Sequence, residues 1–268
     1  MPAVERPDYT LLDRPEVLNA IFHPRGQWGL PTARDDERAP RIEVSAGIYI
    51  GTRFHAVAGA RATILFFHGN GEIAADYDEL GPLYNQMAIN FLVADYRGYG
   101  LSNGQPTVSA MMGDCHIILE YVRKWLGEHG QSSPLIVMGR SLGSASALEL
   151  ATSHAEQIDA LIVESGFAFA EPLLELLGVD TRRIGFKEEQ GFGNLDKIRR
   201  YAGPTLIIHA QHDHIIPFRD GKALHEASAA AHKRLLRIDG ANHNDIFARG
   251  LAPYLQAVQD LVTHLQGT

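Results

Sequence analysis

The nine residues from 137 to 145 constrain the fold of this chain more than any other stretch. The short apolar run before them, Pro134–Met138, has the character of a buried strand, and the residues that follow, Ser144–Ala151, are small or favour a helix. Between them stands Gly-x-Ser-x-Gly. This pattern is typical of a strand that stops, places one serine on a tight strained turn and passes directly into a helix. We therefore predict that Ser141 is a nucleophile at the end of a buried strand.

The residues beside Ser141 fit this turn. Gly139 and Gly143 carry no side chain, so the strand and the helix can pass close to each other. The backbone N–H of Leu142 is expected at the helix N-terminus, where it can face a developing negative charge. The alternative is an ordinary turn in which Ser141 merely caps the helix. A base and an acid at suitable places later in the chain would favour the nucleophile over the capping serine.

Apolar strands and helical segments alternate through most of the chain. Continuous apolar strands separated by helices predict an α/β fold with a mostly parallel central sheet covered by helices on both faces. Partial alternation from residue 42 to 57 adds antiparallel strands at the N-terminal edge. The predicted parallel strands are Ala62–Phe67, Phe91–Asp95, Leu135–Met138, Ala160–Glu164, Thr205–His209 and Arg234–Ile238. The predicted helices cover residues 74–88, 107–129, 142–154, 218–231 and 244–266.

A chain of 268 residues can bury one large core, so we predict a single catalytic domain over residues 41–268. Residues 1–40 are expected to form an arm that packs on this body, with a short helix at Glu16–Phe22 and a loop at 24–40. Residues 167–203 lie between two strands on the side of Ser141. They are either a small cap over the site or a connecting loop with one helix, near Glu171–Leu177.

A serine hydroxyl becomes a nucleophile when a base takes its proton. The base is expected after the serine, in the chain order serine, acid, histidine. His243 fits, because it follows the last apolar strand and precedes the last helix, on the same sheet edge as Ser141. His68 is expected to shape the turn after the first parallel strand. Three further histidines fall in helical patterns and are expected at the surface: His225, His232 and His264.

The acid that orients this histidine should follow the penultimate strand. Asp213 lies on the loop that leaves the strand Thr205–His209, and a buried carboxylate there can hold the Nδ1–H of His243. Glu164, at the end of the preceding strand, is the second candidate. Its structural alternative is an ion pair with Arg140.

The histidines around Asp213 resemble a metal cluster in composition only. His209, His212 and His214 surround the aspartate, but neither His-Glu-x-x-His nor a comparable ligand frame is present. We predict no metal at this position.

The glycine-rich turn after the first parallel strand supplies the second expected donor to a developing oxyanion. The backbone N–H of Asn70 is predicted to point to the same place as that of Leu142. Gly71, Tyr96 and Phe167 are predicted to line the pocket for the acyl group, and Tyr99 is a further candidate. The alternative for these aromatic residues is an ordinary place in the core.

Together these segments resemble the α/β-hydrolase superfamily over residues 60–268, and more narrowly the small lidless ABHD-type serine hydrolases and the prolyl-oligopeptidase-like domains. Ala210 stands near a position where the family usually has glycine. The resemblance implies acyl transfer to water through an acyl-enzyme, without a cofactor, on a small ester or acyl-thioester substrate. The motifs that carry it are His68–Gly71, Asp95–Ser102, Gly139–Gly143, Asp213–Pro217 and Gly240–Asp245.

The composition and charge of the chain argue against some classes of partner and location. A net charge of −8 argues against a nucleic-acid partner, and no run approaches the 18 apolar residues of a membrane span. Cys115 is the single cysteine and is expected to be a buried structural thiol. Residues 1–8 lack the pattern of a signal peptide, so a cytoplasmic location is expected. Two other functions stay open, a serine peptidase and a non-catalytic binding protein with a hydrolase fold.

Overall fold

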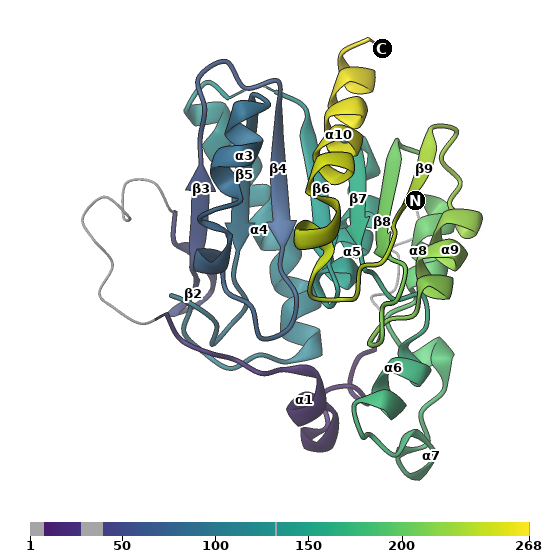
Figure 1. Ribbon diagram of the computed structural model, residues 1–268. Helices are drawn as coiled ribbons and strands as arrows, with labels where there is room; N and C mark the ends of the chain where they lie inside the picture. The colour runs from purple at the N-terminus through teal and green to yellow at the C-terminus, as the bar shows by residue number, and fades with distance from the viewer. Residues whose placement is uncertain (1–7, 28–39, 132, 268) are drawn as a thin grey trace.

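The computed structural model describes residues 8–27, 40–131 and 133–267 (Figure 1). The strands are β1 (Ile42–Ser45), β2 (Ile48–Ile50), β3 (Thr52–His55), β4 (Ala62–Phe67), β5 (Ile89–Ala94), β6 (Leu135–Arg140), β7 (Ala160–Glu164), β8 (Thr205–Ala210) and β9 (Lys233–Ile238). The α-helices are α1 (Pro15–Ile21), α3 (Gly81–Gln86), α4 (Val108–Glu128), α5 (Gly143–Ser153), α6 (Ala170–Leu176), α7 (Thr181–Ile184), α8 (Asn194–Arg200), α9 (Phe218–Ala227) and α10 (Ile246–Gln266). Short 3₁₀ helices are η1 (Ala74–Tyr77), η2 (Ala155–Gln157) and η3 (Glu188–Gln190).

The main sheet has seven strands in the order β3-β5-β4-β6-β7-β8-β9. Only its edge strand β3 runs antiparallel, to β5, and the other described neighbours pair in parallel. β1 and β2 form a separate antiparallel pair. These observations confirm the predicted α/β class, with a mostly parallel sheet and antiparallel strands near the N-terminus.

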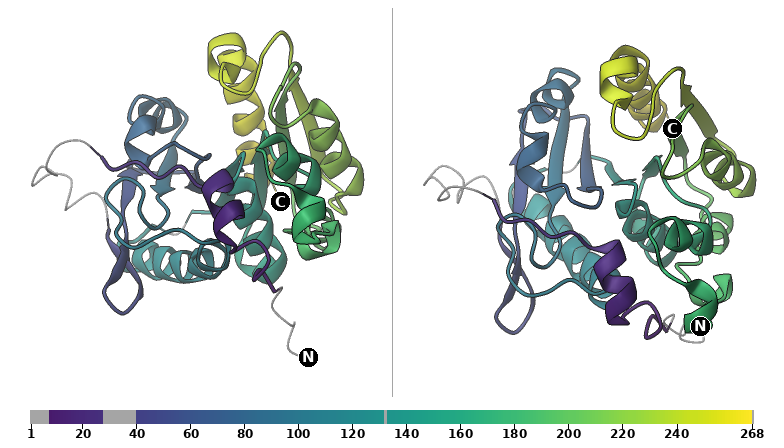
Figure 2. Two further views of the ribbon diagram at one scale, coloured as in Figure 1. Left: turned by 90° about the horizontal axis from the view of Figure 1, so that it is seen from below. Right: turned by 60° about the horizontal axis from the view of Figure 1, so that its bottom comes forward.

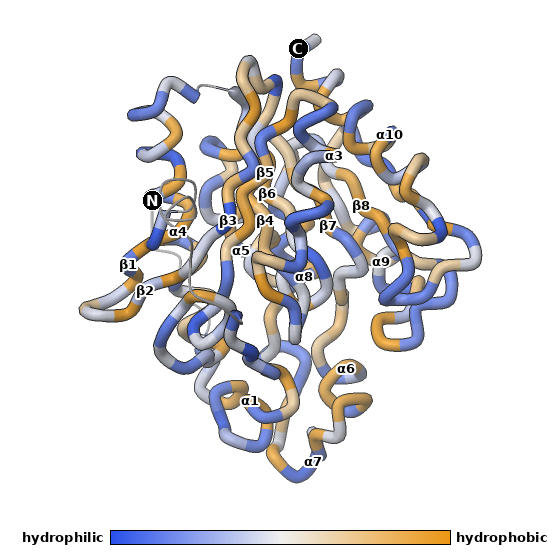
Figure 3. Tube along the Cα trace, turned by 60° about the vertical axis from the view of Figure 1, so that its left-hand side comes forward, coloured by the Kyte–Doolittle hydropathy of each residue, from blue (hydrophilic) through white to orange (hydrophobic). Residues whose placement is uncertain are grey.

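Helices cover both faces of the sheet, with α3 and α10 on one side and α4, α5 and α8 on the other (Figures 1 and 2). Every residue of β4 is buried, and its side chains alternate between two apolar clusters. Leu65 and Phe67 pack with residues of α4 and α5, whereas Ile64 and Phe66 pack with residues of α3 and α10. The hydropathy trace in Figure 3 shows apolar residues concentrated in these central strands. Burial on both faces explains why the parallel strands read as unbroken apolar runs.

The predicted parallel strands begin and end within two residues of the observed ones, and the stretch 42–57, predicted as antiparallel strands without separate bounds, forms β1, β2 and β3.

The chain between β2 and β3 turns from one sheet to the other. The two strands divide at Gly51, so β2 pairs with β1 while β3 pairs with β5. A Cβ atom at Gly51 would meet Cβ of Leu101 at 2.9 Å, so glycine allows the segment of Leu101 to pass close to this point.

Two predicted helices differ from the structure, and the helix α8 was missed. The segment 74–88 divides into η1 and α3, and α3 starts anew at Gly81–Pro82, with proline in its first turn. The segment 218–231 ends four residues early, where Ser228 adopts an extended backbone. The helix α8 was not predicted, because its sequence is mostly polar and charged. Its buried Ile198 and Lys197 contribute too little apolar periodicity to indicate a helix.

The N-terminal segment crosses the end of the sheet near α6 (Figure 2). Its helix α1 falls close to the predicted one, and Leu12, Val17 and Phe22 are buried in the main core. Two of the predictions fall mostly outside the described residues. They concern the loop at 24–40, of which 28–39 are not described, and the stretch without a signal-peptide pattern at 1–8, of which 1–7 are not described.

The single cysteine lies where the sequence predicts. Cys115 is buried in α4, where its thiol donates to the carbonyl of Met112, and burial raises the pKa of that thiol. In the ranges that the structure describes, no helix is long and apolar enough to cross a membrane.

Candidate active site

Ser141 stands on a strained turn between β6 and α5. Its φ of 50° lies in the left-handed region that non-glycine residues rarely adopt. A Cβ atom on Gly139 would overlap the backbone of Gly143, and one on Gly143 would overlap the carbonyl of Phe67. Both glycines are therefore required for the strand and helix to meet at this angle, and the serine is held at the carboxyl end of the sheet.

Three side chains from separate loops meet at this point. The hydroxyl of Ser141 lies 3.2 Å from Nε2 of His243, and Nδ1 of His243 lies 2.7 Å from Oδ2 of Asp213. Asp213 follows β8 and His243 follows β9, so parallel strands deliver both residues to the edge that carries Ser141. This hydrogen-bonded chain can move a proton from the hydroxyl to the imidazole.

The carboxylate of Asp213 is fixed by the backbone of its own loop. It accepts the N–H groups of Ile215 at 3.0 Å and Ile216 at 2.8 Å. Burial alone would raise the pKa of Asp213, but its hydrogen bond with His243 and the N–H of Ile216 together lower it. The carboxylate therefore stays ionised and holds the imidazole in the tautomer with hydrogen on Nδ1.

Glu164 makes a different set of contacts. It is completely buried, and its two oxygens accept Nη1 of Arg140 at 2.9 Å and the hydroxyl of Tyr254 at 2.7 Å. Burial raises the pKa of Glu164 although Arg140 and Tyr254 oppose the shift. The structure thus places Glu164 in the ion pair with Arg140 that the sequence offered as its structural alternative, and places Asp213 at the imidazole.

Arg140 joins three parts of the site through one guanidinium group. Besides Glu164, it donates from Nη2 to the backbone carbonyl of His243 and from Nε to Glu72, both at 2.9 Å. Glu72 in turn accepts the N–H of Gly69 and the hydroxyl of Tyr77, each at 2.6 Å. The glycine-rich turn, the serine turn and the histidine loop are therefore tied together. The sequence offers Arg140 as a partner of Glu164, but no local pattern indicates its contact with Glu72.

Replacing Arg140 with methionine is expected to lower the free energy of unfolding by about 3–5 kcal/mol, because it leaves the buried carboxylate of Glu164 and the partly buried carboxylate of Glu72 without their cation. The double variant Arg140→Met/Glu164→Gln should recover part of this loss, since one of the two stranded charges is also removed. Urea denaturation followed by circular dichroism measures both. A single variant as stable as the wild type would contradict the expected cost.

Asn70 and Leu142, whose backbone N–H groups are predicted to bind an oxyanion, line the same cavity as Ser141. Leu142 is the N-cap residue of α5, at the helix end where N–H groups have no acceptor within the helix. The side-chain amide of Asn70 is occupied elsewhere, since its Oδ1 accepts the N–H of His23 at 2.9 Å and the hydroxyl of Tyr99 at 2.8 Å. No acceptor among the described residues contacts the backbone N–H of Asn70, so that group is available to a ligand.

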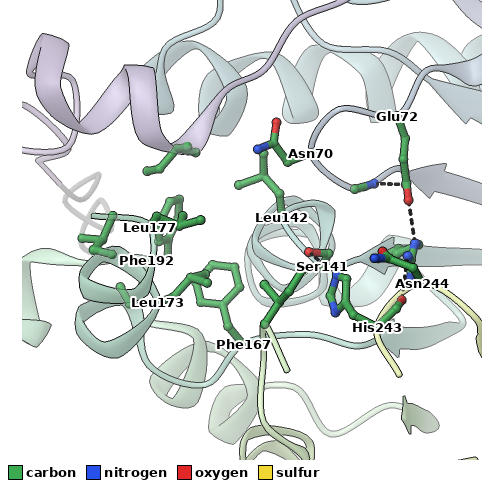
Figure 4. Close-up of a pocket in the computed structure, with 16 residues that line it drawn as sticks. Asn70, Glu72, Ser141, Leu142, Phe167, Leu173, Leu177, Phe192, His243 and Asn244 are labelled. Carbon is green, nitrogen blue, oxygen red and sulfur yellow. Dashed lines mark hydrogen bonds and ion pairs between the residues drawn. The ribbon is translucent and has the colours of Figure 1, made fainter. Parts of the chain in front are cut away.

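An apolar cavity of about 170 Å³ opens at Ser141 (Figure 4). Residues of the segment 167–203 form one side of it, and Ile21 of the N-terminal segment contributes to the wall. The segment 167–203 therefore borders the cavity, as the interpretation as a cap requires. It also contains α7 and α8 besides the one predicted helix. The apolar residues that line the cavity are Ile21, Leu142, Phe167, Ala170, Leu173, Leu174, Leu177, Phe192 and Ile215.

Of the predicted pocket residues, only Phe167 lines this cavity among those that the structure describes. Tyr96 is buried beneath it, with its hydroxyl donating to the carbonyl of His68 at 2.6 Å, and lines a separate small cavity. Gly71 turns its carbonyl to Arg25 at 2.7 Å. Tyr99 contacts Asn70 and His23 instead of the cavity. The rings of Tyr96 and Tyr99 therefore lie in the core, which is the alternative that the sequence left open.

The remaining histidines near the site have structural contacts. His209 is completely buried, with Nε2 at 2.8 Å from the carbonyl of Ile216, and burial lowers the pKa of its ring. His68 is also completely buried and contacts the carbonyl of Gly69 through Nδ1 at 2.8 Å, so it shapes the turn. Within the described part of the chain, no three residues of metal-binding type lie together as a metal site would need.

Known proteins of similar sequence indicate the family of the chain. A family model described as serine aminopeptidase, S33, matches residues 58–179. Alpha/beta hydrolase domain-containing protein 17C of Xenopus laevis is 31% identical over 232 residues, which cover 84% of this chain and 69% of the relative. Protein 17B of Homo sapiens is also 31% identical, over 76% of this chain and 67% of the relative.

Solved structures share the fold. An esterase from Pyrococcus furiosus superposes with a TM-score of 0.70 at 17% identity, covering 90% of this chain and 98% of the esterase. A soluble variant of monoglyceride lipase from Saccharomyces cerevisiae gives 0.66 at 17% identity, over 91% of this chain and 98% of the lipase. With the sequence match to the 17C relative, these findings confirm the resemblance seen in the motifs: the chain belongs to the α/β-hydrolase superfamily.

Proposed function

We propose that this protein is a serine hydrolase that cleaves carboxylic ester or acyl-thioester bonds through an acyl-enzyme intermediate. The observation that carries the proposal is the hydrogen-bonded chain Ser141–His243–Asp213 at the mouth of an apolar cavity. The geometry supplies a nucleophile, a base and an ionised group that orients the base. The esterase and lipase among the structural neighbours are consistent with this chemistry.

In the first half of the proposed reaction, the hydroxyl oxygen of Ser141 attacks the carbonyl carbon of the substrate while Nε2 of His243 takes its proton. The carbonyl oxygen becomes an oxyanion, which the backbone N–H groups of Leu142 and Asn70 bind. The imidazolium that forms is stabilised by Asp213. It then protonates the departing alcohol or thiol, and the acyl group stays on Ser141.

In the second half, His243 removes a proton from water, which attacks the acyl carbon and forms a second oxyanion at the same N–H groups. When that intermediate collapses, the proton returns to Ser141 and the carboxylic acid leaves. The acyl chain lies against Phe167, Leu173 and Phe192, where its transfer from water is favourable. In this arrangement the segment 167–203 and the N-terminal segment serve as walls of the acyl site.

A fluorophosphonate probe tests the proposal directly, because it reacts only with an activated serine. We expect the wild type to be labelled and Ser141→Ala to be unlabelled. Ser153→Ala changes an exposed serine at the far end of the same helix and is the matched control, expected to label like the wild type. An unlabelled wild type, or equal labelling of Ser141→Ala, would refute catalysis at this serine.

A peptidase is the second candidate, because the matching family model is described as serine aminopeptidase. That match ends at residue 179, before Asp213 and His243, so it includes only the serine of the three. A panel of p-nitrophenyl esters, acyl-thioesters and aminoacyl p-nitroanilides separates the two candidates. Esters and thioesters should be turned over faster, and faster turnover of the anilides would reverse this order.

A further inference from the structure

A second and larger depression, of about 500 Å³, adjoins the site at His243. It shares Glu72, Arg140, His243 and Asn244 with the apolar cavity, so the two spaces meet at the same imidazole. Its other described lining residues come from η1 and the residues after it and from the start of α10, which lie far from the segment 167–203 in the chain. The site is thus open on two sides.

The lining residues indicate which part of a substrate enters each space. Leu142 and Asn70, which carry the proposed oxyanion donors, line the first cavity and are absent from the described lining of the second. His243 lines both. A leaving group must lie within reach of Nε2 of His243 to receive its proton, and it departs on the side of the imidazole. The second space therefore fits the leaving group, and the first fits the acyl chain.

The second space is apolar inside and acidic at its rim. Tyr77, Leu80, Leu83, Ile246, Phe247 and Leu251 provide its apolar surface. The positive charge of Arg140 is balanced by its ion pairs with Glu72 and Glu164, and Arg25 pairs with Asp76. Glu79 lines the depression and is exposed, and it takes part in none of the ion pairs among the described residues. The local charge is therefore negative where a leaving group would enter.

From this arrangement we propose that the groove beside His243 is a leaving-group subsite that selects alcohols or thiols with positive charge over neutral ones, and neutral ones over anionic ones. The inference rests on the proposed function and extends it to the substrate class. An acidic entrance raises the local concentration of cations and lowers that of anions, so the selection acts on kcat/KM. Phosphate-bearing thiols such as coenzyme A are disfavoured leaving groups at this site.

Three thioesters of hexanoic acid test the order of preference. They carry thiocholine, 2-mercaptoethanol or 2-mercaptoethanesulfonate, which are cationic, neutral and anionic, and the released thiol is measured with a disulfide reagent at low salt. Each kcat/KM is divided by the rate of alkaline hydrolysis, which removes differences in intrinsic reactivity. We expect roughly a threefold step for each unit of charge, shrinking in 0.5 M NaCl as the charges are screened.

Glu79→Lys is the decisive variant, because the side chain is exposed and its charge is reversed without disturbing a buried contact. It should lower the cation-to-anion ratio by roughly tenfold, whereas Glu128→Lys, at the exposed end of α4, should keep the wild-type ratio. Equal ratios in the wild type and Glu79→Lys would overturn the subsite while leaving the hydrolase proposal intact. Wild-type protein that hydrolyses none of the three and resists fluorophosphonate would overturn both.

Discussion

Replacing His243 with alanine is expected to lower kcat for a p-nitrophenyl ester by at least about 10³-fold while the protein stays folded. The imidazole is the only group that the structure places at the hydroxyl of Ser141 within the described residues, at 3.2 Å. Without it no base takes the serine proton, and the three groups fail as a unit. Steady-state kinetics measures the loss, and a thermal melt followed by circular dichroism reports the fold.

The fold should survive because the other contacts of this loop do not use the ring. Arg140 holds the backbone carbonyl of His243, and the carboxylate of Asp213 keeps the N–H groups of Ile215 and Ile216. His225→Ala, on α9, is the matched control and should keep wild-type kcat. Turnover of His243→Ala within tenfold of the wild type, with its fold intact, would remove this histidine from the proposed mechanism.

Asp213→Asn is expected to lower kcat by about 10³–10⁴-fold, because an asparagine amide favours the wrong tautomer of His243 and cannot stabilise the imidazolium. The carboxylate lies 2.7 Å from Nδ1 of the ring and is kept ionised by its surroundings. The effect should appear in kcat at every pH between 6 and 9, measured with a p-nitrophenyl ester and with a thioester.

Glu164→Gln is the comparison that separates the two candidate acids. Its carboxylate contacts Arg140 and Tyr254, so we expect lower thermal stability and only a mild loss of turnover. A severe kinetic loss in Glu164→Gln together with a mild loss in Asp213→Asn would move the role of acid to Glu164. Both variants should be compared at a temperature well below their melting transitions.

Much of the fold and the meeting of three side chains could be predicted from the sequence because both depend on local patterns. Each parallel strand is buried on both faces and therefore appears as an apolar run, such as 62–67 or 160–164. Parallel strands place their carboxyl ends on one edge, so loops after separate strands converge there. The positions of Ser141, Asp213 and His243 relative to those strands were sufficient to predict that they lie close together.

The walls of the cavity could not be predicted, because they depend on how segments distant in the chain pack. The sequence predicts the helix that carries Leu173 and Leu177 but not which of its residues face the site. Phe192 comes from a stretch without a clear pattern, and Ile21 comes from the N-terminal segment. The sequence predicts Tyr96 in the pocket because it follows a strand toward the site. In the structure its hydroxyl instead donates to the backbone carbonyl of His68, and the ring is buried. The contacts of Arg140 with Glu72 and Glu164 likewise join residues 68 and 24 positions apart.

Ile21 belongs to a helix that precedes every strand of the sheet, yet it touches the same cavity as Ser141. Residues 58–179, where the family model matches, leave that helix out. Under the proposed function, this helix forms part of the acyl site although the matched scaffold does not include it. Exchanging the opening segment between homologues is therefore expected to change which acyl chains are accepted while the sheet and the reactive groups stay the same.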